Sequence, residues 1–158
     1  MARVYIETTI PSAYWEERTA PEMVARRNWT RRWWDVERSH YEVVTSVAVL
    51  DELSRGNHPK RQEKMAMLDS VKKLGIDESV IEIVEVYLIH KVMPSDPQGD
   101  ALHLALASLH KCDMLLTWNC QHLANANKVG HIQRVNTRMG LMVPQLITPL
   151  ELLHEDLS

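Results

Sequence analysis

The most visible absence in this sequence of 158 residues is phenylalanine, which does not occur once. Tryptophan, methionine and leucine supply the bulky apolar side chains, and the hydrophobic fraction of 45% and charged fraction of 25% are typical of a globular domain. A chain of this length buries about two thirds of its unfolded surface when it folds, so it needs no disulfide or structural metal. We expect one domain over residues 1–158.

Cysteine and long apolar runs are also scarce. Cys112 and Cys120 form no CxxC pair and are too few for a disulfide framework, so we expect free thiols in a reducing compartment. The first residues, MARVYIETTIPS, contain no apolar signal-peptide core. No apolar run approaches the roughly 20 residues of a membrane span. These absences predict a cytoplasmic protein without membrane association.

Basic residues are not in excess, because the formal net charge is −3. Proteins that bind nucleic acid through charge alone are usually basic, so this balance counts against passive binding. It does not exclude a nuclease whose acidic side chains bind divalent cations, since those cations supply the positive charge that faces the phosphate.

The residues that are present alternate between strand and helix patterns. Short apolar runs rich in β-forming residues predict strands at residues 3–7, 41–45, 74–76, 114–117 and 146–148. Apolar spacing, capping side chains and terminal glycines predict helices over residues 22–38, 46–55, 60–73, 77–91, 96–110 and 131–139. Such alternation is typical of an α/β fold in which helices cover both faces of a mostly parallel sheet.

The helix predicted to begin at Asp96, with Pro97 as its first helical residue, is apolar nearly all round and should be buried. Asp100 lies near its start, where an uncompensated carboxylate is costly to bury. The free amides of the helix end compensate in part, but Asp96 already fills the capping role. A metal ion would compensate more.

Other polar side chains lie at positions in the sequence that a parallel sheet would bring to one edge. The crevice of such a sheet lies beyond the carboxyl ends of its strands. Glu7 ends the first strand and Asn119 follows the strand at 114–117, while Glu52 and Asp100 lie on helices that can turn toward this edge. Three carboxylates and one amide oxygen suit Mg²⁺ or Mn²⁺, and two such ions can stabilise the attacking and leaving oxygens of a phosphodiester displacement.

Four ordered blocks of sequence resemble those of PIN domains, in particular the VapC-type toxin-like branch. The blocks are VYIETTIPS at 4–12, VLDELSRG at 49–56, GDALHLALA at 99–107 and LLTWNCQHLANA at 115–126. VPQLITPLELL resembles the family's closing strand and tail, so the resemblance spans nearly the whole chain. It implies a PIN-like three-layer α/β/α domain with a central sheet of about four to five strands.

The resemblance also implies roles for single residues. The family's positions that bind Mg²⁺ or Mn²⁺ and hydrolyse RNA fall on Glu7, Glu52, Asp100 and Asn119. Thr117 matches a residue that supports the fourth position, and Thr9 stands where many members carry Asn. The first position is usually Asp and the fourth often Asp. Glu7 is therefore one methylene longer and Asn119 lacks a charge, so the metal is expected to shift or bind more weakly.

By the same resemblance the protein is expected to be the endoribonuclease toxin of a type II toxin–antitoxin system, a homodimer inhibited by a small antitoxin, with RNA as its substrate. No covalent enzyme intermediate is expected. Two alternatives stay open. One is a PIN module that binds RNA or a protein without cleavage, which Glu7 and Asn119 favour. The other is a nuclease acting on DNA, although the chain lacks the larger insertions of such relatives.

Several neighbours of the predicted site allow two interpretations. His103 shares a helix face with Asp100, and either contacts a site carboxylate or is a hydrogen-bonded core residue. His122 either reaches the substrate or stays in a solvated position. Asp51 points about 100° away from Glu52 around its helix, so we expect it to lie outside the metal site.

The most concentrated basic feature is an arginine run on the helix predicted over 22–38. It either follows an RNA backbone, with Trp29 or Trp34 as a stacking surface for bases, or forms a solvated helix face. Trp33 and Trp34 are adjacent and face different directions, so one of them is expected to be exposed. The run consists of Arg26, Arg27, Arg31 and Arg32.

Overall fold

The structure, a computed structural model, describes residues 1–92, 99–119 and 126–154. Its centre is a five-stranded sheet with strand order β3-β2-β1-β4-β5, in which every neighbouring pair is parallel. The strands are β1 (Arg3–Ile6), β2 (Glu42–Ser46), β3 (Lys72–Leu74), β4 (Met114–Leu116) and β5 (Gln145–Ile147). The predicted α/β class and parallel sheet are thus confirmed.

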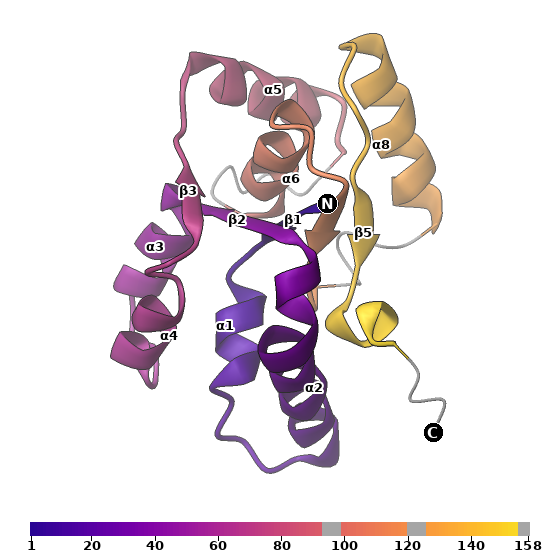
Figure 1. The fold of residues 1–158 in the computed structure, drawn as a ribbon. Coiled ribbons are helices and arrows are strands. Elements are labelled where there is room, and N and C mark those ends of the chain that lie inside the picture. Colours follow the sequence, from indigo (N-terminus) through magenta and orange to yellow (C-terminus); the bar gives the residue numbers. More distant parts are fainter. Residues whose placement is uncertain (93–98, 120–125, 155–158) are drawn as a thin grey trace.

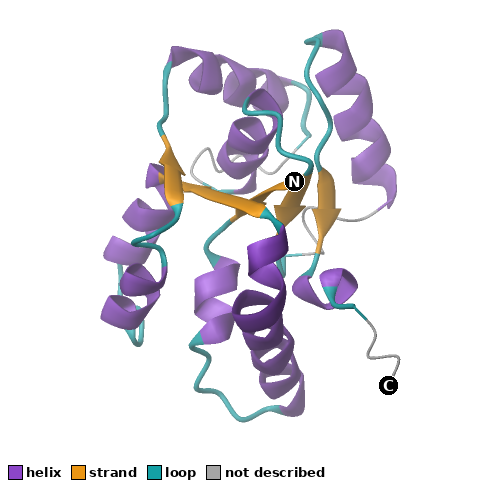
Figure 2. Cartoon of the chain, in the orientation of Figure 1, coloured by secondary structure: helices purple, strands orange, loops and turns teal. Residues whose placement is uncertain are grey.

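Helices connect the strands and cover both faces of the sheet (Figures 1 and 2). Between β1 and β2 lie α1 (Thr9–Tyr14), α2 (Pro21–Arg32), the π-helical turn η1 (Trp33–Glu37) and the 3₁₀ turn η2 (Arg38–His40). The other helices are α3 (Val47–Ser54), α4 (Arg61–Met67), α5 (Glu78–Ile89), α6 (Asp100–Leu109), α8 (Ala126–Arg138) and the 3₁₀ turn η3 (Pro149–Leu152).

The central strand β1 contributes to two hydrophobic cores, one on each face of the sheet. Val4 and Ile6 pack into the core that contains Trp33, whereas Tyr5 packs into the opposite core with Leu104. This follows from the alternation of side chains along a strand, which places neighbours on opposite faces. Figure 1 shows α1, α2 and α4 on one side of the sheet and α5, α6 and α8 on the other.

Helix ends agree with several sequence signals. The Asp77 side chain caps α5 by accepting a hydrogen bond of 3.1 Å from the backbone N–H of Val80. Gly56 and Gly140 follow α3 and α8 with φ of 71° and 70°, the left-handed conformation that ends many helices. The Asp96 cap and Cys120 lie outside the described residues.

Several expectations about elements and side chains were wrong. The helix predicted over 60–73 ends at Met67, and the helix predicted over 131–139 begins at Ala126. The sequence patterns predicted no helix at α1; Pro11 lies in the first turn of this helix, where its missing N–H costs nothing. Strand β3 lies two residues earlier than predicted, since Lys72 and Lys73 belong to this edge strand. Trp33 and Trp34 are both buried. The Arg38 guanidinium lies 4.0 Å from the Trp34 ring centroid and covers it.

None of the helices in the three described ranges is both long enough and apolar enough to cross a membrane.

Candidate active site

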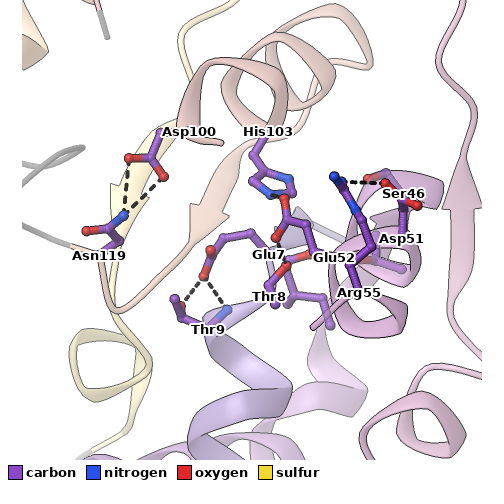
Figure 3. A network of polar contacts seen from close by, with 12 residues as sticks. Glu7, Thr8, Thr9, Ser46, Asp51, Glu52, Arg55, Asp100, His103 and Asn119 are labelled. Carbon is purple, nitrogen blue, oxygen red and sulfur yellow. Dashed lines mark hydrogen bonds and ion pairs between the residues drawn. The ribbon is translucent and has the colours of Figure 1, made fainter. Parts of the chain in front are cut away.

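Glu7 follows the last residue of β1, and its side chain is almost completely buried. Its Oε1 accepts hydrogen bonds from the backbone N–H of Thr9, at 2.9 Å, and from the Thr9 hydroxyl (Figure 3). Burial raises the pKa of Glu7 to about 7, although His103 and the two Thr9 hydrogen bonds oppose this shift. A carboxyl group in this state would gain from a nearby cation.

Glu52, on α3, is fixed by hydrogen bonds to both of its oxygens. Its Oε1 lies 2.8 Å from His103 Nε2, and its Oε2 accepts from the Thr8 hydroxyl. His103 Nδ1 lies 2.7 Å from the Tyr5 hydroxyl, which lies 2.7 Å from Ser46 Oγ. This buried chain of polar groups connects β1, β2, α3 and α6.

The two ends of the Glu52–His103 contact stabilise each other's charge. Burial alone raises the pKa of Glu52, but the hydrogen bond and charge of His103, with Thr8, outweigh it and lower the pKa. Burial alone lowers the pKa of His103, but Glu52, Glu7 and Asp100 outweigh it and raise the pKa. His103 is therefore both a buried residue and a direct partner of a predicted site carboxylate.

Asp100 is the first residue of α6, preceded by Gly99 at the capping position. Its Oδ1 and Oδ2 each lie 3.1 Å from Asn119 Nδ2, so the amide N–H groups of Asn119 face the carboxylate (Figure 3). The backbone N–H of Asn119 donates to Thr117 Oγ1 at 2.9 Å, which fixes the loop after β4. For Asn119 to bind a cation, its amide must turn to present Oδ1.

The four predicted metal-binding residues line one cavity of about 460 Å³ at the carboxyl edge of the sheet. Other residues on its wall are Thr8, Thr9, Arg55, Gly99 and His103. Oxygen donors of this kind suit a hard divalent cation, and the buried Glu7 supplies a group that such an ion would stabilise. However, within the described ranges no three His, Cys, Asp or Glu side chains are already gathered around one point as metal ligands.

The predicted RNA-binding arginines do not share one face. Arg26 lies over the Trp118 ring, 5.5 Å from its centroid. Arg31 donates to the backbone of α1 and Arg32 to the backbone of the C-terminal segment. Arg27 Nε is buried without a hydrogen-bond partner among the described residues. Of the four, Arg26 lines a hollow beside the candidate site.

Sequence reasoning missed Tyr5, Thr8 and Ser46, which hold Glu52 and His103 in place. One signal was available for Tyr5, because a buried tyrosine hydroxyl between apolar strand residues needs a hydrogen-bond partner. His122, which was considered for substrate contact, lies outside the described residues.

No family model and no curated protein matches this sequence. Among solved structures, the chain resembles the crystal structure of FitAcB from Neisseria gonorrhoeae, with a TM-score of 0.54. The match covers 94% of this chain and 99% of that one at 15% sequence identity. A likeness at this identity concerns the fold alone, and it agrees with a PIN-like three-layer α/β/α arrangement.

Proposed function

We propose that this protein is a metal-dependent endoribonuclease that hydrolyses RNA phosphodiester bonds in the cavity lined by Glu7, Glu52, Asp100 and Asn119. The observation that carries the proposal is that these side chains reach one cavity from four separate segments, at the edge where α/β sheets bind ligands. The PIN-like fold and the four sequence blocks support the same function.

Each polar group has a role in this proposal. Mg²⁺ or Mn²⁺ held by Glu7, Glu52, Asp100 and Asn119 would supply positive charge to the phosphate and to the attacking and leaving oxygens. Thr9 orients Glu7, while His103 and Thr8 orient Glu52. Because Asp100 and Asn119 already contact each other, they lie where one ion could replace their mutual hydrogen bonds.

The proposal extends to the biological setting implied by the sequence blocks. We propose that the protein is a cytoplasmic toxin of a type II toxin–antitoxin system, that it forms a homodimer, and that a small antitoxin protein inhibits it. Support for this role comes from the resemblance to VapC-type sequences. A short open reading frame beside the gene is the observation that would test it.

A second function, a PIN module that binds RNA or a protein without cleaving, is favoured by one observation. In the described residues the carboxylates are hydrogen-bonded to protein groups and are not already gathered as metal ligands. Cleavage is therefore the property that separates the two functions.

The test compares matched single-stranded RNA and DNA oligonucleotides with Mn²⁺, Mg²⁺ or EDTA. We expect the wild-type protein to cleave RNA only with a divalent cation, and Asp100→Asn to be slower by about 100-fold or more. Asp51→Asn is the matched control, because Asp51 neighbours Glu52 but is exposed and pairs with Arg55. Folded wild-type protein that shows no metal-dependent RNA cleavage would contradict the proposal, and cleavage of DNA alone would contradict its substrate.

A further inference from the structure

A second hollow, which we call the side pocket, adjoins the candidate active site. It measures about 250 Å³ and lies between α1, α2 and the residues that follow β4. Thr9 and Asn119 line both the side pocket and the cavity of the carboxylates. A chain bound across the carboxylates would therefore pass directly beside this pocket.

The wall of the side pocket combines flat apolar surface with positive charge. Met23 and the indole of Trp118 supply apolar surface, and Arg18 and Arg26 supply the charge. The volume lies below the roughly 300–1,000 Å³ of pockets for drug-sized ligands, so it suits a single heterocycle. Aromatic rings and guanidinium planes are the groups on which unpaired nucleobases stack.

Trp118 is held rigidly as one side of this pocket. Its indole Nε1 donates to Thr30 Oγ1 at 2.8 Å, and its ring stacks on Trp29 with centroids 6.1 Å apart. Its backbone N–H donates to Thr9 Oγ1 at 2.9 Å, and the same hydroxyl donates to Glu7. A single threonine hydroxyl thus connects the wall of the side pocket to a site carboxylate.

The charged groups favour a base inside the side pocket and phosphate outside it. Arg18 pairs with Glu16 at 2.6 Å and Arg26 pairs with Glu22 at 2.8 Å. Such partly exposed ion pairs are weak, so either guanidinium can exchange its partner for a phosphate oxygen or a base face. Glu16 itself lines the pocket, and its carboxylate disfavours a phosphate there more than a neutral base.

We propose that the side pocket binds one unstacked nucleobase of single-stranded RNA, belonging to a nucleotide next to the scissile phosphate. The base lies against Met23 and Trp118 and stacks on the guanidinium of Arg26. The inference rests on the proposed function for the position of the scissile phosphate. It adds that an unpaired base at one fixed position speeds cleavage.

The test uses a single-stranded RNA with one mapped cut, and versions in which one nucleotide on either side of the cut is abasic. We expect one abasic position to lower kcat/KM by about 10-fold, because stacking of one base is worth 1–3 kcal/mol. An abasic nucleotide placed far from the cut should have no effect. The double variant Met23→Ala, Arg26→Gln should lower kcat/KM for intact RNA by a similar factor and leave the abasic RNA unaffected.

The control variant is Arg32→Gln, which alters an arginine on the same helix that contacts the C-terminal segment instead of the side pocket. Equal losses on intact and abasic RNA in the double variant would overturn the inference, as would unchanged rates for all abasic substrates.

Binding of the same RNAs in EDTA, followed by fluorescence anisotropy, separates the two proposals. Cleavage without dependence on the base refutes the side-pocket inference alone. Base-dependent binding without cleavage supports a base-binding side pocket but refutes the enzyme, and with it the position of the base beside a scissile phosphate. The absence of both cleavage and base-dependent binding refutes both.

Discussion

Glu7 combines a position fixed by the sheet with an unusual state of protonation. It is the first residue after the central strand β1, and only 3% of it is exposed to solvent. Burial brings its pKa to about 7, so the metal-free protein holds a proton there near neutral pH. Because a metal ligand must release its proton, cation binding and protonation of Glu7 compete.

The raised pKa of Glu7 predicts how the stability of the metal-free protein depends on pH. The folded protein keeps the Glu7 proton up to about pH 7, whereas the unfolded chain loses it near the ordinary value of 4.5. The free energy of unfolding should therefore fall as the pH rises from about 5 to 8. We expect Glu7→Gln to flatten this dependence and to be more stable than wild type at pH 8, by on the order of 3 kcal/mol.

Urea denaturation in EDTA at pH 5 and pH 8 measures this effect. A smaller slope of the same sign should remain in Glu7→Gln, because the pKa of His103 is also raised and its stabilising contribution is lost as the pH rises. An unchanged slope in Glu7→Gln would show that the Glu7 carboxyl is not protonated in the folded protein.

The residues of the candidate site were predictable to different degrees. Glu7, Glu52, Asp100 and Asn119 stood out because of their positions relative to strand ends and their match to the sequence blocks, and they line one cavity. Thr8 was not predictable, because its hydroxyl contacts Glu52, a residue 44 positions away on α3. Trp118 was missed for the same reason, since its partners lie on α1 and α2.

At the scale of elements, one buried asparagine links three helices on one face of the sheet through hydrogen bonds. Asn136, on α8, accepts a hydrogen bond from the Tyr87 hydroxyl of α5 at 2.6 Å. Its amide donates to Ser108 of α6 at 2.9 Å and to the Met142 carbonyl at 3.0 Å. Asn136 itself has no exposure, so water cannot replace it without rearrangement.

We expect Asn136→Ala to lower the free energy of unfolding by about 3 kcal/mol, because several buried polar groups lose a partner at once. Gln133→Ala is the matched control on the same helix, since Gln133 is exposed and should change stability by less than about 0.5 kcal/mol. Urea denaturation at one pH compares the two. A loss in Asn136→Ala no larger than in the control would mean that this network contributes little.

Long elements with clear patterns were the predictable ones. The Asp77 cap and the terminal glycines Gly56 and Gly140 mark helix ends, because local chemistry alone determines them. Helix α1, with six residues, and the π-helical turn Trp33–Glu37 are too short to be stable by themselves and depend on tertiary packing. Their formation could not be inferred from periodicity.

At the scale of the whole molecule, the strand order explains where the site lies. Strand β1 lies between β2 and β4. The chain first adds β2 and β3 on one side of β1, and later adds β4 and β5 on the other side. Ligands of open α/β sheets bind at such a point, beyond the carboxyl ends of the strands. The alternating pattern predicted parallel strands, but their order depends on long-range packing and was not predicted from the sequence.

At this scale, the net charge of −3 and the cavity lined by carboxylates both mean that binding of a phosphate requires divalent cations. A phosphate can approach these carboxylates only when cations neutralise them. The central claim is therefore that Glu7, Glu52, Asp100 and Asn119 hold a divalent cation together.

Anomalous diffraction from a crystal soaked in Mn²⁺ tests this claim most directly, with Asp100→Asn crystals as the control. We expect an anomalous peak roughly 2–2.5 Å from oxygens of at least three of the four side chains, with the Asn119 amide turned toward the ion, and no such peak in Asp100→Asn. A wild-type cavity without an anomalous peak at saturating Mn²⁺, or a peak that contacts none of the four residues, would contradict it.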